Sequence, residues 1–177
     1  MHYKFCPQCG EELEGKLAGD DGLVPFCKNC DQYWFDTFPT CVIVLVANEY
    51  NEVTLLRQSY MSDKYSSFVS GYMSMGETAE EAAIREVYEE LGIELESIEY
   101  GGSYWFGEKG ILMLGFIAFA KKCEMVLSSE VDSASWVPAA EALQYMWPPG
   151  PGNAAYGIYI KYMDSLKKKG FVSSSPF

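Results

Sequence analysis

Three carboxylates with helical spacing lie in the middle of the chain, at Glu86, Glu89 and Glu90. Because an α-helix has about 3.6 residues per turn, this spacing brings all three onto one helix face. Crowded carboxylates repel one another, and a hard divalent cation such as Mg²⁺ or Mn²⁺ relieves that repulsion while it binds phosphate oxygens. The pattern predicts a metal site for a phosphate compound, although an isolated acidic helix face is more often only solvated.

The helix that carries these carboxylates is marked at both ends. Thr78 and Glu81 have the spacing of a capping box, and Gly92 stands where a helix ends. We expect Gly71 and Gly76 in the loop before the helix, where glycine lets the backbone approach a metal or phosphate. The opposite, packing face is expected to contain Ala83, Ile84, Val87 and Leu91.

The stretch from Gly71 to Ile93 resembles the complete Nudix box. The matching positions are Gly71, Glu77, Arg85, Glu86, Val87, Glu89, Glu90, Gly92 and Ile93. The resemblance implies an α/β fold, the Nudix α/β/α sandwich, and hydrolysis of a nucleoside diphosphate linked to another moiety. It also implies that the box glutamates bind Mg²⁺ or Mn²⁺.

Two further residues of the box have supporting roles in this interpretation. The planar guanidinium of Arg85 suits it to hold a carboxylate by paired hydrogen bonds, so we assign it an orienting role. Glu77 is expected to brace the loop or a cation. We predict that water attacks one phosphorus of the diphosphate, and that Glu89 or Glu90 accepts the proton of that water.

Two cysteine pairs near the N-terminus predict a structural Zn²⁺ site. Cys6 and Cys9 form one CxxC pair, Cys27 and Cys30 form the other, and seventeen residues separate them. Two such knuckles complete a closed tetrahedral shell of four sulfurs. The alternatives are disulfides, which a reducing cytoplasm disfavours, or unrelated buried thiols.

The cysteines divide the chain into an expected zinc ribbon at residues 1–36 and a Nudix domain at residues 37–177. Residues 10–26 are acidic and contain Lys16 as their one basic side chain. A ribbon that grips phosphates should be more basic, so we expect it to staple the fold or to contact a second subunit in a homodimer. The aromatic residues 33–35 are expected to pack in the core rather than stack on a base.

The rest of the chain predicts a mixed sheet with flanking helices. Strands are expected at residues 40–47, 53–58, 68–70, 98–106, 111–120 and 135–137. The first two should form a hairpin. Helices are expected at residues 138–146, with Pro138 in the first turn, and at residues 153–169. The final SSSPF should fray.

The ribbon and the box together resemble the NADH pyrophosphatase family over residues 6–163. Val69–Tyr72 is similar to that family's entry into the box, and residues 148–155 are similar to the proline-rich turn before its last helix. By this resemblance Glu130, which precedes residues 135–136, binds a further metal ion or positions the attacking water. Alternatively, Glu130 is an ordinary loop carboxylate.

One segment departs from that family. Its members carry Ser-Gln-Pro-Trp-Pro-Phe-Pro, whereas residues 103–110 here keep the serine and aromatic residues but have no proline. This predicts a more flexible or differently shaped nucleotide pocket. Tyr104, Trp105 and Phe106 are the candidates for stacking on a base. We expect NADH, NAD⁺ or a related dinucleotide as substrate, with ADP-ribose or nucleoside triphosphates as alternatives, and a non-catalytic nucleotide sensor as the rival class.

Length, composition and charge agree with a small soluble enzyme. The chain has 177 residues, of which 49% are hydrophobic, enough for one main core and a small appendage. It contains no run of about 18 apolar residues to span a bilayer and no signal peptide, so a cytoplasmic protein without membrane partners is expected. The net charge of -12 argues against a broad nucleic-acid surface. A reduced version of the longer relatives is expected, because the chain starts almost at the ribbon.

Overall fold

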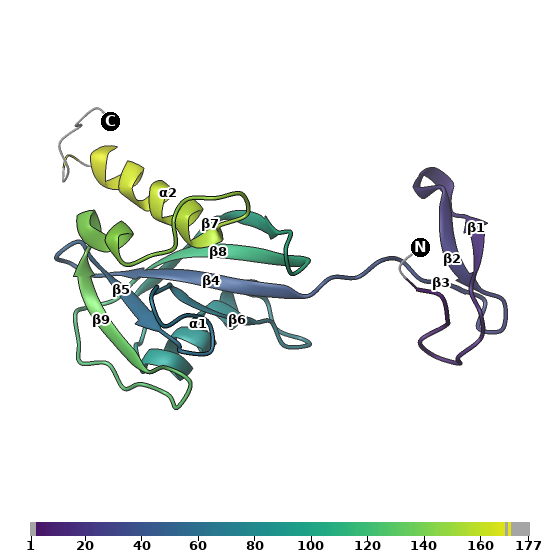
Figure 1. The fold of residues 1–177 in the computed structure, drawn as a ribbon, viewed down its shortest axis with the longest axis horizontal. Helices are drawn as coiled ribbons and strands as arrows, with labels where there is room; N and C mark the ends of the chain where they lie inside the picture. Colours follow the sequence, from purple (N-terminus) through teal and green to yellow (C-terminus); the bar gives the residue numbers. More distant parts are fainter. Residues whose placement is uncertain (1–2, 169, 171–177) are drawn as a thin grey trace. The chain divides into compact units, whose positions relative to one another are not determined.

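The computed structural model describes residues 3–168 and residue 170. It divides into two compact units, Met1–Phe38 and Pro39–Phe177. The boundary in the sequence lies two residues after the expected one. Figure 1 colours the chain from the first unit to the second. The fraying expected for SSSPF and the last residue of the helix expected at 153–169 lie outside the described residues.

The N-terminal unit is a small three-stranded antiparallel sheet. Its elements are β1 (Glu14–Leu17), the 3-10 helix η1 (Gly19–Asp21), β2 (Leu23–Cys27) and β3 (Gln32–Tyr33), and the strands pair in the order β1-β2-β3. Cys6, Leu13 and Cys27 form its buried centre, and Trp34 packs against them. So small an apolar centre agrees with the prediction that a metal staples this unit.

The second unit is built on a six-stranded mixed sheet. Its strands are β4 (Thr40–Ala47), β5 (Glu52–Arg57), β6 (Val69–Tyr72), β7 (Ser97–Phe106), β8 (Ile111–Phe119) and β9 (Ser133–Pro138). The order is β7-β8-β4-β5-β9, and β6 also pairs with β4. Strands β4 and β8 are parallel, while the other pairs are antiparallel, including the expected hairpin of β4 and β5.

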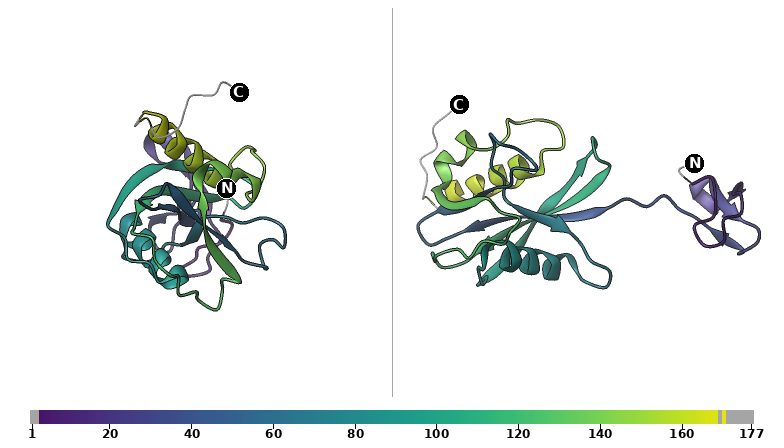
Figure 2. Two further views of the ribbon diagram at one scale, coloured as in Figure 1. Left: turned by 90° about the vertical axis from the view of Figure 1, so that its left-hand side faces the viewer. Right: turned by 60° about the horizontal axis from the view of Figure 1, so that its bottom comes forward.

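Strand β4 is buried on both faces because its residues alternate between two cores. Val42, Val44 and Val46 pack with helix α1 (Ala79–Leu91). Ile43, Leu45 and Ala47 pack with helix α2 (Ala154–Lys168) on the other face. The two helices therefore lie on opposite sides of the sheet (Figures 1 and 2), which confirms the expected α/β/α sandwich.

Two expectations for the helices need correction. The helix expected at residues 138–146 is a 3-10 helix, η2 (Ala139–Gln144). Ile84 does not belong to the packing face of α1, because 46% of it is exposed. The buried stripe instead includes Ala82 and Glu90. Compared with the expected orientation, the helix is rotated about its axis, so that one of the three glutamates is on the buried side.

The last helix begins one residue after its expected start. Asn153 precedes α2, and its Oδ1 accepts a hydrogen bond of 3.0 Å from the Tyr156 amide.

No helix among the described residues is long and apolar enough to cross a bilayer.

Candidate functional site

Helix α1 has the predicted terminal contacts. Thr78 Oγ1 accepts from the Glu81 amide at 3.2 Å, and the Glu81 carboxylate accepts from the Thr78 amide at 2.8 Å. At the other end Gly92 adopts a φ of 66°, which is left-handed, and its amide donates to the Tyr88 carbonyl. These local contacts fix where the helix begins and ends.

Gly71 has no side chain, so the carboxylate of Glu86 lies close against the backbone at this position. A Cβ added at Gly71 would stand 2.0 Å from Glu86 Cδ and 2.2 Å from Oε1. The expectation that Gly71 lies in the loop is wrong, because it belongs to β6 and pairs with Val42 of β4. Gly76 does lie in the loop, with a φ of 91°. The first glycine of the box therefore makes room for a carboxylate.

Arg85 joins three acidic side chains of the box. Its Nε and Nη2 donate to the two oxygens of Glu77 at 3.0 and 2.7 Å. Its Nη1 donates to Glu86 at 2.7 Å and to Glu89 at 3.0 Å, and Nη2 also reaches the Tyr72 carbonyl at 3.1 Å. This is the paired geometry predicted for Arg85, with Glu77 as the carboxylate that it holds.

Arg85 keeps Glu77 ionised. Hydrogen bonds from Arg85, followed by one from the Ser74 amide, lower the pKa of Glu77 to about 2. Hydrogen bonding to Glu77 is also the main cause that raises the pKa of Arg85 above its ordinary value. At neutral pH Glu77 and Arg85 therefore form a charged pair.

Glu90 is in a different environment from its two box partners. It is buried, Gln58 Nε2 donates to its Oε1 at 2.9 Å, and its Oε2 has no hydrogen-bond partner. Burial raises the pKa of Glu90 to about 7; the charges of Glu86, Glu130 and Glu89 add to this rise, and the hydrogen bond from Gln58 opposes it. A buried carboxylate oxygen without a donor is costly unless a cation completes it.

The chemistry of these residues fits a divalent cation. The orphaned Glu90 Oε2 and the carboxylate oxygens of Glu86 and Glu89 are ligands of the kind that a hard metal ion prefers. Within the described part of the chain, however, the four cysteines are the only group of at least three acidic, histidine or cysteine ligand atoms that lie within 4.8 Å of one another. The carboxylates of Glu86, Glu89 and Glu90 share a helix face but do not converge this closely.

Glu130 lies close enough to Glu90 for their charges to interact. Its charge contributes to the raised pKa of Glu90 and to that of Tyr60. The loop that carries Glu130 is attached to the end of α1, because the Ser128 amide donates to the Glu90 carbonyl at 3.2 Å. Its role with a metal ion or with water stays a prediction.

The three aromatic candidates are consecutive residues at the end of β7, and their exposure alternates along the strand. The ring of Tyr104 packs in the core beside α2, where a Cβ at Gly157 would stand 2.2 Å from it, and its hydroxyl donates to the Gly101 carbonyl at 3.3 Å. Trp105 is half exposed and Phe106 is partly buried. Base stacking stays a prediction for these residues, with Trp105 the most accessible of them.

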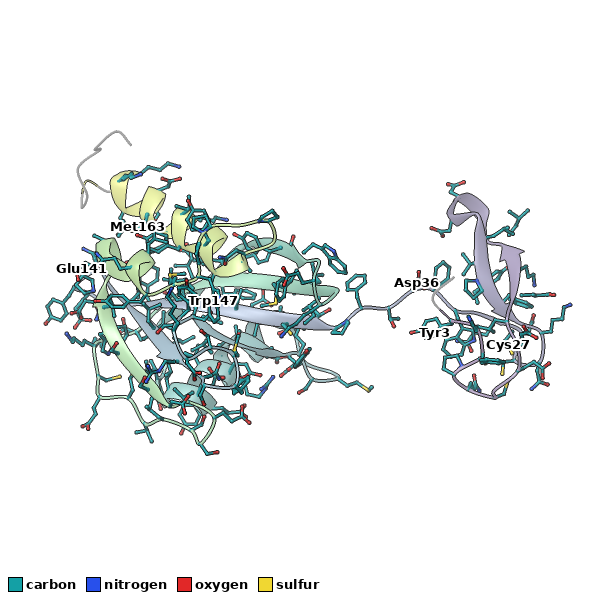
Figure 3. The ribbon with its side chains drawn as sticks, viewed as in Figure 1. Tyr3, Cys27, Asp36, Glu141, Trp147 and Met163 are labelled. Carbon is teal, nitrogen blue, oxygen red and sulfur yellow. The ribbon has the colours of Figure 1, made fainter. Side chains whose placement is uncertain are left out.

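The four cysteines of the N-terminal unit are close together. Their sulfurs all lie within 4.8 Å of one another, and they are free thiols, with separations of 3.9 Å between Cys6 and Cys30 and 3.5 Å between Cys9 and Cys27. A hydrogen bond from the Glu11 amide is the main cause that lowers the pKa of Cys9 to about 6. Cys27, which Figure 3 labels, is fully buried. The donor set fits a tetrahedral Zn²⁺.

Sequence reasoning missed Gln58 as part of the site. It follows the apolar residues of β5 and is buried, with 3% exposed, although glutamine is usually found at the surface. A polar residue directly after a buried strand was a weak signal, because its partner Glu90 lies 32 residues away in sequence.

Comparisons with known proteins identify the family of this chain. The sequence-family model of the NUDIX domain matches residues 37–155, about two-thirds of the chain. The chain belongs to the Nudix family. It is 33% identical over 170 residues to NAD-capped RNA hydrolase NudC of Pseudomonas aeruginosa, covering 96% of this chain and 58% of that protein. It is 29% identical to the protein of the same name from Pseudomonas entomophila, covering 89% of this chain and 54% of that one. The chain thus spans little more than half the length of these relatives.

Solved Nudix structures share the fold. A NUDIX hydrolase from Nitrosomonas europaea has a TM-score of 0.64 at 18% identity, covering 95% of this chain and 94% of that one. The NUDIX domain of Shewanella oneidensis NrtR, solved with ADP ribose, has a TM-score of 0.63 at 14% identity, covering 80% of this chain and 94% of that one. At these identities the likeness establishes the Nudix fold of this chain.

Proposed function

We propose that this protein is a metal-dependent Nudix hydrolase that cleaves the phosphoric anhydride of a nucleoside diphosphate linked to another moiety. The observation that carries this proposal is the buried Glu90 oxygen without a partner, on the same helix as Glu86 and Glu89 in a complete Nudix box. A solvated acidic helix face would not bury one of its carboxylates in this way.

The chain's own residues have distinct tasks in this proposal. Glu86, Glu89 and Glu90 hold Mg²⁺ or Mn²⁺, and Arg85 orients the first two while Glu77 anchors Arg85. When bound, the metal ions neutralise the diphosphate and lower the pKa of the attacking water. Glu89, Glu90 and Glu130 are the candidates to accept the proton of that water.

The name of the relatives directs the choice of substrate. Because the Pseudomonas proteins are named NAD-capped RNA hydrolases, NADH, NAD⁺ and NAD-capped RNA are the first candidates. The expectation that nucleic acid is not a partner stays a prediction, and capped RNA tests it directly. ADP-ribose and nucleoside triphosphates remain the alternative substrates, because residues 103–110 lack the prolines of the NADH pyrophosphatase family.

A substrate panel tests the proposed function. The purified chain is incubated with Mg²⁺ or Mn²⁺ and with NADH, NAD⁺, NAD-capped RNA, ADP-ribose or a nucleoside triphosphate, and products are separated by chromatography. Glu89→Gln should abolish most turnover, whereas Glu94→Gln, which changes an exposed glutamate outside α1, should not. Tight nucleotide binding without turnover of any member would instead support the non-catalytic sensor.

For the N-terminal unit we propose a structural Zn²⁺ held by Cys6, Cys9, Cys27 and Cys30. The close free thiols support it, since a closed four-sulfur shell leaves no position for a substrate. A homodimer stays a prediction, which sedimentation velocity of the zinc-loaded chain tests.

A further inference from the structure

Gln58 is the one side chain with a hydrogen bond to the carboxylate of Glu90 among the described residues. It follows β5 directly, and its Nε2 donates to Glu90 Oε1 at 2.9 Å across a buried contact. The second oxygen, Oε2, is buried and has no partner. The two oxygens of one carboxylate are therefore unequal, with one satisfied by protein and one not.

The backbone around Gln58 is fixed independently of α1. The Gln58 carbonyl accepts from the amides of Met61 and Ser62 at 2.9 and 3.1 Å. On either side of it, the Arg57 carbonyl accepts from the Asp132 amide at 2.9 Å, and the Ser59 amide donates to the Asp132 carboxylate. The Gln58 amide group thus projects from a braced turn, so it can determine the orientation of Glu90.

The chemical nature of the donor matters for a metal ligand. Arg85 holds Glu86 and Glu89 with a positive charge, which offsets part of the negative charge offered to a cation. Gln58 is neutral, so it restrains Glu90 by a hydrogen bond and leaves the charge of the carboxylate intact. Donors of this kind orient ligands from outside the metal shell, and their loss typically lowers metal affinity or activity by about 10- to 100-fold.

We infer that Gln58 is a positioning residue, which occupies Oε1 of Glu90 and thereby presents Oε2 to a divalent cation. The inference rests on the proposed function only in requiring a cation at the box. It assigns Gln58 no contact with substrate. If Gln58 were merely structural, its removal would lower stability without changing the affinity of the folded protein for metal.

Direct metal binding separates these two roles. The zinc-loaded full chain is titrated with Mn²⁺, and free Mn²⁺ is followed by electron paramagnetic resonance. Gln58→Met keeps the length of the side chain and removes the donor, whereas Gln58→His keeps a ring N–H as a donor. Gln144→Met is the matched control, because Gln144 is exposed at the end of η2. Thermal unfolding establishes that each variant is folded.

We expect Gln58→Met to weaken Mn²⁺ binding by about 10-fold, Gln58→His to recover part of the loss, and Gln144→Met to bind as the wild type does. Raising the metal concentration should restore turnover of Gln58→Met, with the nucleotide KM at saturating metal unchanged. Equal Mn²⁺ affinity of wild type and Gln58→Met would overturn the inference.

Failure of the proposed function gives a different result. If wild type binds Mn²⁺ but turns over no substrate, hydrolysis is disproved while the titration still decides the role of Gln58. If wild type binds no Mn²⁺ with or without nucleotide, both the metal-dependent function and the role of Gln58 are overturned.

Discussion

The four cysteines and the three box glutamates are both predicted ligand sets, but folding assembles them to different extents. The cysteine sulfurs lie within 4.8 Å of one another, whereas the glutamates do not meet that closely. Glu86 and Glu89 share Arg85 Nη1, and Glu90 is turned inward to Gln58. The cysteines form a compact cluster, whereas the glutamates lie on one helix without converging.

The charge of the ligands explains this difference. Burial raises the pKa of Cys27, and a hydrogen bond with Cys9 raises that of Cys30 to about 12, so these two thiols stay neutral and can crowd against the other two sulfurs. Ionised carboxylates repel one another, and at a separation of about 4 Å the repulsion is about 4 kcal/mol even at an effective dielectric constant of about 20. Arg85 supplies an opposite charge between Glu86 and Glu89. Spacing along a helix therefore predicts a shared face but not a closed site.

Loss of one cysteine should have the largest effect, because a tetrahedral site tolerates no missing ligand. Cys27→Ser should reduce the zinc content from about one ion per chain to nearly none, measured by mass spectrometry of the metal. Cys123→Ser, at an exposed cysteine, should keep its zinc. Full zinc retention in Cys27→Ser would break the contrast between the two ligand sets.

A methyl group at Gly71, where the Glu86 carboxylate lies, tests how precisely the box glutamates must be positioned. Gly71→Ala introduces a Cβ that would stand 2.0 Å from Glu86 Cδ, so the carboxylate must move. We expect kcat/KM to fall by about 100-fold, because displacement of about 1 Å can cost that much. Gly150→Ala adds a methyl group with no atom within 4 Å and should change kcat/KM little. Equal kinetics for both variants would contradict this account of Gly71.

Replacing the guanidinium of Arg85 tests whether its geometry, as well as its positive charge, positions the glutamates. Arg85→Lys keeps the positive charge but cannot make two hydrogen bonds to Glu77 while also reaching Glu86 and Glu89. We expect kcat/KM to fall by about 10-fold with an increased requirement for Mg²⁺. Arg57→Lys, at an exposed arginine, serves as the control in the same assay. An unchanged Mg²⁺ requirement would show that charge alone positions the glutamates.

The smallest effect concerns acid stability. The pKa of Glu77 is lowered from 4.5 to about 2 in the folded chain, chiefly by Arg85. The stability from this pair is therefore fully present above pH 4.5 and is lost as the pH falls from about 4.5 to about 2. Across this window, the thermal midpoint of Glu77→Gln should decline less steeply than that of wild type, as followed by circular dichroism. Glu80→Gln, at an exposed site on α1, should keep the wild-type slope.

Local sequence signals determined much of this protein. The capping box and Gly92 set the ends of α1, the apolar run at residues 40–47 became β4, and the paired cysteines came together as predicted. These features depend on backbone contacts within a few residues or on ligand spacing in one small unit. They can be predicted from the sequence because the residues involved are close in the chain and also close in space.

Tertiary packing alone decided the details of the glutamate site. Helical periodicity fixes the angular order of side chains but not which angle faces the sheet, so it could not show that Glu90 is buried and Ile84 exposed. Pairing with β4 placed Gly71 in a strand, and the braced turn after β5 brought Gln58 to Glu90. Each of these contacts joins residues far apart in sequence, and their geometry exists only once the sheet and α1 have packed together.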